Sequence, residues 1–397
     1  MLFVVTNMKR KKILLCTTVP ETFNFILRYQ PAYLNQFYEV FIVTSPSEGA
    51  NLIEDREGVT LTPVRMQRGI NPFFDFYSIC CMMLVMIRIR PDIVHSYTPK
   101  AGLISMLAAC LCRVPIRVHT FTGLIFPTMH GFKKRLLIGI DRLICACSTD
   151  IVPEGMGVKS DLMNFNITNK PLQVIGHGNI AGVDTTYFCS NALGVEAAAA
   201  TLRLELGIDK GEFVFCFVGR LNKDKGLNEL MLAFSALSSS AHLLLVGVAD
   251  KTAPISSDVL CAIDLHPRVH ALGFMNDIRP ALRASNVLVL PSYREGFPNS
   301  VLQAASMEIP VIASDINGCN EVIEPGLNGW LVPPRNSLAL RNAMSEAMQT
   351  PFEMLLNMGQ QARSRIEQRF EQRHHWMRML QFYQVLLESK NEIKYGK

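Results

Sequence analysis

The sequence predicts an α/β protein built from two doubly wound, Rossmann-like domains. Its 397 residues exceed what one ordinary hydrophobic core holds, so two domains of about 200 residues each are the natural division. In both halves, short apolar runs of strand type alternate with longer stretches of helix type. This alternation is typical of a parallel sheet wrapped by helices.

The elements follow this alternation from one end of the chain to the other. In the first half we expect strands at residues 13–16, 40–43, 93–95, 116–119 and 172–175, and helices near 22–37, 73–90, 101–112 and 132–147. The second half opens with a helix ending at Gly207, and its strands are expected at 213–218, 242–246, 269–272, 287–290 and 311–313. We therefore place one domain at 1–190, a second at 205–372, and a last helix at 373–397 that returns toward the first domain.

Composition excludes several classes of protein. Hydrophobic residues make up 49% of the chain and charged residues 18%, so the chain is globular rather than disordered. A net charge of +5 permits contact with phosphates or an anionic membrane surface but does not suggest a nucleic-acid binder. Most of the eleven cysteines lie in apolar runs, which favours free thiols over disulfides. The pairs Cys110/Cys112 and Cys145/Cys147 have the wrong spacing for zinc.

The sequence shows no secretion signal. The apolar start of the chain precedes the basic run at residues 9–12, whereas secretion needs the opposite order. Either Met1 or Met8 can be the true start. No apolar run reaches the roughly 20 residues that span a bilayer. The nearest, at 72–89, contains Asp75 and Arg88 and indicates a buried or interfacial helix.

A first candidate site follows the apolar strand at 213–218. Arg220 and Lys225 lie in the loop after Gly219, just before a helix is expected to begin. Ligands of open α/β sheets bind beyond the carboxyl ends of the strands, and helix N-termini favour phosphate. These two cations are therefore placed to bind a diphosphate, which Arg can do in a bidentate manner. The plainer interpretation is a solvated basic loop.

A second candidate site follows the strand at 287–290. Glu295 stands before Gly296-Phe297-Pro298-Asn299, and a helix is expected from about Ser300 with Asn299 as its cap. A carboxylate beside a phosphate-binding helix end is electrostatically odd unless it meets hydroxyl groups, as in a sugar. Alternatively, Glu295 faces solvent from a capped loop.

Together the two segments resemble the donor site of family-4 retaining glycosyltransferases. The signature of this family is a Glu, seven intervening residues and a second Glu. The resemblance continues through residues 279–311, 314–318 and 328–334. In the first half, residues 91–95, 98–102, 119–123 and 178–184 are similar to the branch that makes capsules and lipid-linked oligosaccharides. The likeness covers nearly the whole chain.

This resemblance implies the GT-B fold, in which two Rossmann-like domains face a central cleft. The N-terminal domain would bind the acceptor and the C-terminal domain a UDP-sugar. Arg220 and Lys225 would hold the diphosphate, and Glu295 would bind sugar hydroxyls. Gly219, Phe274, Gly296, Phe297, Pro298, Asn299 and Gln303 complete the donor-binding residues. Such enzymes need no metal or other cofactor, and the sequence has no Asp-X-Asp pair.

Three positions depart from the family pattern. Gln303 replaces the second signature Glu, which accepts hydrogen bonds from ribose in the family; an amide oxygen also accepts, but with less charge assistance. Glu308 stands where a small residue, usually Gly, is common. Thr122 stands where many members have a His, and His119 lies three residues earlier.

The acceptor side is expected to involve His95, Lys100, His119 and Thr122, although a loop lysine and a structural histidine are the plainer interpretations. Residues 132–143 alternate basic and apolar side chains, which suits either an anionic membrane surface or an ordinary surface helix. The family branch favours the membrane, because its acceptors are often sugars on polyprenyl diphosphates.

We therefore expect an enzyme that moves a hexose or an N-acetylhexosamine from a UDP-sugar to a lipid-linked glycan, at the cytoplasmic face of the cell membrane. The rival hypotheses are a catalytically idle sugar-nucleotide-binding subunit and a GT-B-type nucleotide-sugar epimerase.

Overall fold

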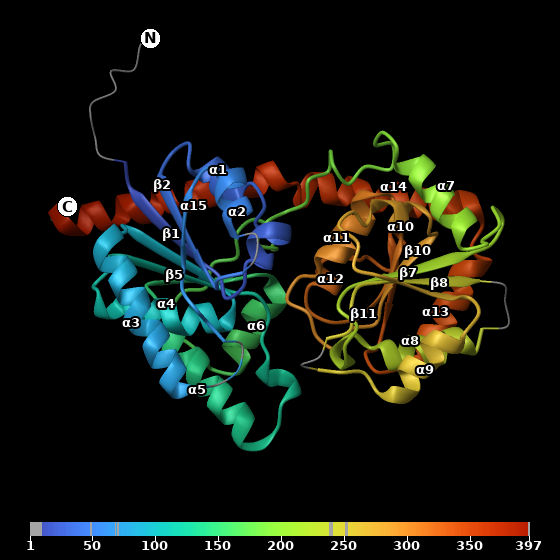
Figure 1. The fold of residues 1–397 in the computed structure, drawn as a ribbon, viewed down its shortest axis with the longest axis horizontal. Helices are drawn as coiled ribbons and strands as arrows, with labels where there is room; N and C mark the ends of the chain where they lie inside the picture. Colours follow the sequence, from blue (N-terminus) through green and yellow to red (C-terminus); the bar gives the residue numbers. More distant parts are fainter. Residues whose placement is uncertain are drawn as a thin grey trace, which may run out of the picture. The chain divides into compact units, whose positions relative to one another are not determined.

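The structure, a computed structural model, describes residues 10–395 apart from 48–49, 68, 70, 238–240 and 251–252, so the choice between Met1 and Met8 lies outside the described residues. The chain forms two compact units, one of Met1–Ala181 with Arg373–Lys397 and one of Gly182–Gln372 (Figure 1). The sequence had ended the first domain at 190 and begun the second at 205.

The first unit is built on a parallel six-stranded sheet of order β3-β2-β1-β4-β5-β6. The strands are β1 Lys12–Cys16, β2 Glu39–Thr44, β3 Thr60–Pro63, β4 Ile93–Tyr97, β5 Ile116–Phe121 and β6 Asp150–Pro153. The helices are η1 Thr22–Ile26, α1 Gln30–Leu34, α2 Ala50–Glu57, α3 Pro72–Ile89, α4 Pro99–Leu111, η2 Phe126–Thr128, α5 Gly131–Cys147 and α6 Met156–Asn164.

Two sequence-based predictions in this unit are wrong. The expected strand at 172–175 makes only an isolated bridge between Leu172 and Ile151, and β6 takes the outer place in the sheet. The expected helix at 22–37 divides into η1 and α1, because Tyr29 has a left-handed φ of 66° and Pro31 follows it. A proline lacks the N–H that a continuing helix needs and sterically restricts the residue before it.

The last helix, α15 Gln372–Tyr395, lies along the first unit (Figure 1). Met379, Phe382 and Tyr383 are buried in the same core as strand residues Ile13 and Val118. A second core lies among the strands and α3, α4 and α5. The first sheet is therefore covered on both faces, which agrees with the continuous apolar runs in β1 and β2.

The second unit repeats the arrangement with sheet order β12-β11-β10-β7-β8-β9. Its strands are β7 Val214–Val218, β8 His242–Val246, β9 Val269–Gly273, β10 Val287–Leu290, β11 Val311–Ser314 and β12 Gly329–Val332. Its helices are α7 Val195–Glu205, η3 Lys223–Lys225, α8 Leu227–Ser235, α9 Ser257–Leu265, α10 Arg279–Arg283, α11 Asn299–Ser306, α12 Cys319–Val322, α13 Ser337–Gln349 and α14 Phe352–Arg369. The prediction of two Rossmann-like α/β domains is thus confirmed.

Helix α3 is the apolar helix that the sequence expected to be either buried or interfacial. Within the described residues, α3 alone is long and apolar enough to cross a membrane, yet only 28% of it is buried. Its low buried fraction excludes the fully buried alternative and leaves the interfacial one. All eleven cysteines are free, and Cys16, Cys145, Cys147, Cys216 and Cys319 are buried.

Candidate functional site

The second unit brings the two sequence-predicted loops together. Strands β7 and β10 are neighbours, with Phe215 opposite Val287, although β8 and β9 separate them in sequence. The strand order reverses at this pair, and open α/β sheets bind ligands beyond the carboxyl ends of the strands at such a point. The space between the two loops that follow β7 and β10 is here called the crevice. The loop after β7 carries Arg220 and Lys225, and the loop after β10 carries Glu295.

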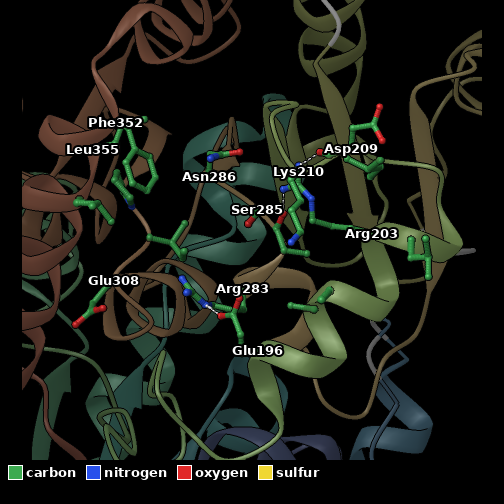
Figure 2. Close-up of a pocket in the computed structure, with 18 residues that line it drawn as sticks. Glu196, Arg203, Asp209, Lys210, Arg283, Ser285, Asn286, Glu308, Phe352 and Leu355 are labelled. Carbon is green, nitrogen blue, oxygen red and sulfur yellow. Dashed lines mark hydrogen bonds and ion pairs between the residues drawn. The ribbon is translucent and has the colours of Figure 1, made fainter.

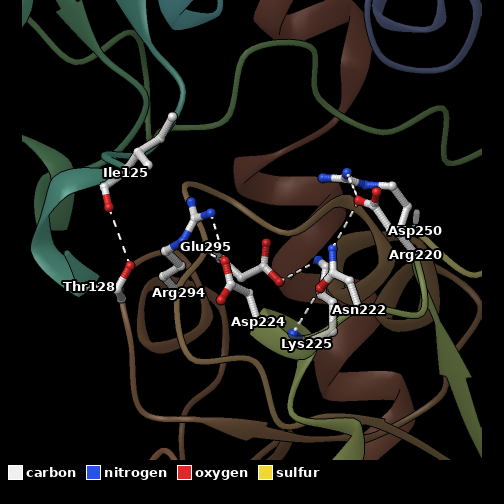
Figure 3. A network of polar contacts seen from close by, with 9 residues as sticks. All are labelled: Ile125, Thr128, Arg220, Asn222, Asp224, Lys225, Asp250, Arg294 and Glu295. Carbon is white, nitrogen blue, oxygen red and sulfur yellow. Dashed lines mark hydrogen bonds and ion pairs between the residues drawn. The ribbon is translucent and has the colours of Figure 1, made fainter. Parts of the chain in front are cut away.

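Lys225 and Glu295 form an ion pair across this crevice, with 2.5 Å between Nζ and Oε1 (Figure 3). Both side chains are largely shielded from water, at 19% and 13% exposure. The Asn222 side chain caps η3 by accepting a hydrogen bond from the Lys225 N–H at 3.2 Å. Each charge thus compensates the other, and an anion that binds Lys225 must compete with Glu295.

Arg220 is paired in the same way, but with a residue that the sequence did not indicate. Its guanidinium lies 2.5 Å from Oδ2 of Asp250, which is only 8% exposed, whereas Arg220 is 57% exposed (Figure 3). Asn222 Nδ2 also approaches Asp250, at 3.4 Å. Asp250 follows β8, thirty residues from Arg220, and no local pattern pointed to it.

A further ion pair and two glycines hold the loops close. Asp224 binds Arg294 at 2.8 Å, and its carbonyl accepts a hydrogen bond from the Tyr293 N–H at 2.8 Å. A Cβ on Gly226, whose φ is 69°, would lie 2.0 Å from the Pro291 carbonyl oxygen. A Cβ on Gly318, at φ 77°, would lie 2.4 Å from the Gly296 oxygen. Only glycine fits such contacts at a left-handed φ.

The other predicted donor residues occupy different environments. The Phe297 ring is buried against Phe370 at 5.3 Å between centroids, so only its backbone can meet a ligand. Asn299 is the first residue of α11 rather than its cap, which is Pro298; this corrects the capping expectation. Gln303 is half-buried on α11 and Phe274 is exposed after β9. Gly219 directly follows β7 and donates its N–H to the Val246 carbonyl.

Both predicted acceptor-side histidines are buried in the first unit and bonded internally. His95 Nδ1 lies 2.6 Å from the Tyr383 hydroxyl and Nε2 2.7 Å from Thr120 Oγ1. His119 Nδ1 lies 2.8 Å from Ser96 Oγ. Burial lowers the pKa of His95 well below its ordinary value and that of His119 to about 3, so both rings are neutral. A direct contact with an acceptor does not fit this burial.

Lys100 is also engaged, because its Nζ binds both carboxylate oxygens of Asp75 at 2.7–2.8 Å. This pair joins α4 to α3 and does not fit a lysine held ready for an acceptor phosphate. Thr122, half-buried directly after β5, is the remaining predicted residue. Two further hydroxyl groups, of Thr18 and Thr98, lie at the point where the strand order of the first sheet reverses. These residues follow β1 and β4, and their hydroxyl oxygens are 2.6 Å apart.

Glu308 lies away from this crevice. Its φ is 62°, a conformation that glycine adopts without cost, which explains why a small residue suits the position. Its Oε2 accepts a hydrogen bond from Ser190 Oγ at 2.8 Å. It lines a cavity of about 610 Å³ (Figure 2). Residues just before β10 and β11, such as Asn286 and Pro310, line the same cavity. The cavity therefore lies at the amino edge of the sheet, opposite the loops that carry Lys225 and Glu295.

The described residues contain no group of three or more His, Cys, Asp or Glu side chains placed to hold a metal ion. Metal independence stays a prediction from the family resemblance.

Comparisons with known proteins identify families and relatives that this chain resembles over most of its length. The family "Glycosyl transferases group 1" matches residues 212–350, and "Glycosyl transferase 4-like domain" matches residues 25–176. The capsular polysaccharide biosynthesis glycosyltransferase CapM of Staphylococcus aureus is 29% identical over 388 residues, covering 96% of this chain and 99% of CapM. An Escherichia coli UDP-Gal:alpha-D-GlcNAc-diphosphoundecaprenol alpha-1,3-galactosyltransferase is 28% identical, covering 75% of this chain and 76% of its own.

Among solved structures, Anabaena Alr3699/HepE in complex with UDP and glucose superimposes with a TM-score of 0.79. It covers 94% of this chain and 100% of its own at 17% identity. At that identity the likeness concerns the fold.

Proposed function

Since this chain belongs to the family-4 glycosyltransferases with the GT-B fold, we propose that it is a retaining, metal-independent enzyme transferring a sugar from a UDP-sugar to a lipid-linked glycan. The observation that carries this proposal is the Lys225–Glu295 pair at the crevice between β7 and β10. The names of the relatives support the donor and the acceptor: one uses UDP-Gal and a diphosphoundecaprenol acceptor, and a structural neighbour binds UDP.

The ion pairs suggest how the donor engages the site. A diphosphate attracts Lys225 away from Glu295 and Arg220 away from Asp250, because two phosphates offer more negative charge than one carboxylate. Glu295 is then released to accept hydrogen bonds from sugar hydroxyls. Arg220 and Lys225 go on to stabilise the charge that develops on the leaving diphosphate.

Retention would follow from attack on the face that the diphosphate leaves. The leaving diphosphate itself helps to accept the proton of the attacking hydroxyl, so no separate general base is required. Gln303 takes the place of the ribose-binding carboxylate and accepts with its amide oxygen.

We place the acceptor contacts of the first unit outside the buried histidines and the Asp75–Lys100 pair. Thr122, Thr18 and Thr98 remain as candidates after the strands β5, β1 and β4. We further propose that the enzyme acts peripherally at the cytoplasmic face of the cell membrane in surface polysaccharide or oligosaccharide assembly.

Saturation-transfer NMR with a panel of UDP-, GDP- and ADP-sugars tests the donor assignment. We expect selective binding of UDP-sugars that is lost in Arg220→Ala. Arg283→Ala is the matched control, because Arg283 pairs with Glu196 beside the cavity at the opposite edge of the sheet. Binding of no sugar nucleotide, or equal loss in both variants, would refute the donor site. The anomeric configuration of the product, read by NMR, then tests retention.

The same experiments separate the rivals. Conversion of a labelled UDP-sugar to an isomer without acceptor would establish an epimerase. An inactive parent that gains transfer activity with Gln303→Glu would establish the idle subunit.

A further inference from the structure

Helix α3 presents an apolar stripe to solvent. Five large side chains on it, here called the α3 stripe, are 57–90% exposed: Phe73, Phe76, Tyr77, Leu84 and Ile87. Their positions repeat at intervals of three, four or seven residues, so they lie on one face of the helix. The stripe extends for about 21 Å, from fourteen rises of about 1.5 Å. Contiguous exposed apolar surface of this kind marks an interaction site.

The other face of α3 is fixed in the first unit. Met82, Met86 and Ile89 are buried in the core that α3 shares with α4. Asp75, 7% exposed, binds Lys100 of α4, and Ser78 donates to the Arg65 carbonyl at 2.7 Å. A helix held in this way cannot cross a bilayer without breaking the core and exposing a buried ion pair. The stripe is therefore available only to something that approaches from outside.

The charges around the stripe are cationic. Asp75, the helix's one acid, is neutralised by Lys100. At the C-terminal end of α3, Arg88 and Arg90 are exposed. Beside them, Ile87 and Leu111 line an apolar groove of about 440 Å³, with Arg90 and Arg113 among its lining residues. At the other end, a hydrogen bond with Cys81 raises the pKa of the Tyr77 hydroxyl, and the positive charge of nearby Arg65 opposes this rise.

We propose that the α3 stripe lies flat on an anionic lipid bilayer, with its aromatic and aliphatic side chains in the headgroup–acyl boundary. Arg88, Arg90 and Arg113 would bind lipid phosphates at its edge. Apolar side chains supply the partition energy, and cations select negatively charged lipids. This inference deepens the proposed function, which supplies a lipid-borne acceptor, but lipid binding is measured without any sugar transfer.

The sequence had allowed an interfacial position for residues 72–89, and it had offered residues 132–143, which lie in α5, for contact with an anionic membrane. On α5, Phe132 and Leu136 are exposed among basic residues. Asp141 and Ile144 lie on the inner, buried face of α5. Since α5 mixes cations into its exposed face, whereas the α3 stripe is uninterrupted by charge from Phe73 to Ile87, we assign the main apolar contact to α3.

Sedimentation with lipid vesicles tests the assignment on the full chain. The parent should bind phosphatidylcholine vesicles containing a quarter phosphatidylglycerol, and bind pure phosphatidylcholine less. Phe73→Ser/Phe76→Ser/Leu84→Ser should lower the partition coefficient at least about tenfold. Leu265→Ser/Leu338→Ser, which alters equally exposed apolar residues of the second unit, should bind like the parent. Arg88→Ser/Arg113→Ser should remove only the preference for the anionic lipid.

A second measurement uses a variant in which the α3 stripe stays apolar. Both native tryptophans, Trp330 and Trp376, are buried, so a new exposed tryptophan reports its own environment. Phe76→Trp emission should shift to the blue on addition of anionic vesicles, and Leu338→Trp emission should not.

Three results would overturn the proposal: no binding of the parent to anionic vesicles, unchanged binding by the triple α3 variant, or a parent dimer in sedimentation that the α3 variant abolishes. Loss of binding in Lys133→Ser/Arg135→Ser but not in the α3 variant would assign the contact to α5. Sugar-nucleotide binding, measured by NMR on the same variants, should be unchanged, so failure of the donor site and failure of the membrane surface are distinguishable.

Discussion

Replacing Gly226 by alanine tests the close approach of the two loops that carry Lys225 and Glu295. The new Cβ would lie 2.0 Å from the Pro291 carbonyl oxygen and 2.8 Å from its carbon. Backbone atoms cannot rotate aside, so the loops must separate by about 1 Å to restore an ordinary contact. We expect this displacement to lengthen the Lys225–Glu295 pair.

The cost has two parts that a control separates. A left-handed conformation costs a residue with a Cβ about 1–2 kcal/mol, and overpacking adds about 1–3 kcal/mol. Gly207→Ala has the first cost alone, because Gly207 has a φ of 66° and nothing within 4 Å of its Cβ position. Gly226→Ala should therefore unfold about 2–12 °C below Gly207→Ala, at roughly 2–4 °C per kcal/mol.

We expect Gly226→Ala to lower the rate of sugar transfer more strongly than it lowers thermal stability. A misplacement of about 1 Å near the reacting groups can lower turnover about a hundredfold, so transfer by Gly226→Ala should fall by that order while Gly207→Ala stays near the parent. Differential scanning fluorimetry and initial rates at saturating donor measure the two effects. If Gly226→Ala matched Gly207→Ala in both, the loops would not be in the contact described and the reasoning would be refuted.

Three further predictions concern residues outside the crevice. Tyr383→Phe removes the 2.6 Å partner of His95 Nδ1 and leaves only the Tyr97 hydroxyl, at 3.2 Å. It should cost about 1 kcal/mol in urea unfolding, with UDP-sugar affinity unchanged; a gain in stability would contradict the network. Burial raises the pKa of Asp141 to about 7, so the native state retains a proton that the unfolded chain releases above about pH 4. The contribution of Asp141 to the free energy of unfolding of the parent protein should therefore decrease between about pH 4 and 7, by up to about 4 kcal/mol. Asp141→Asn should therefore gain thermal stability over the parent at pH 8 but not at pH 4; an equal gain at both would exclude titration as the cause. Glu308→Gly relieves a left-handed φ but loses the Ser190 bond, so stability should change by no more than about 1 kcal/mol. An altered donor affinity in that variant would place Glu308 in the site after all.

The sequence predicted the sheets best where strands are buried on both faces. All five residues of β8 are buried, and the four after His242 form a continuous apolar run that indicates a buried strand. The edge strand β3 was missed because its four residues, Thr60–Pro63, are exposed or half-buried and carry no such run. The break between η1 and α1 was missed because the periodicity of residues 22–37 does not reveal the left-handed φ at Tyr29.

The functional site, like the fold, was predicted only in part. Arg220, Lys225 and Glu295 were identified because each sits in a recognisable loop at the end of a strand, and the strand order alone brings those loops to one crevice. The ion-pair partners of these residues could not be predicted from the sequence. Asp250 is thirty residues from Arg220, and Glu295 is seventy from Lys225. Such pairings depend on register and loop closure between distant segments.

What the sequence by itself determined was therefore everything that local pattern encodes: two doubly wound units, the loops that end β7 and β10, and the charges those loops carry. Only the tertiary structure decided which of the chemically able side chains are accessible. It buried His95 and His119, tied Lys100 to Asp75, and left the apolar stripe of α3 in water. Accessibility is set by what packs against a residue from elsewhere in the chain, and no window of sequence contains that neighbour.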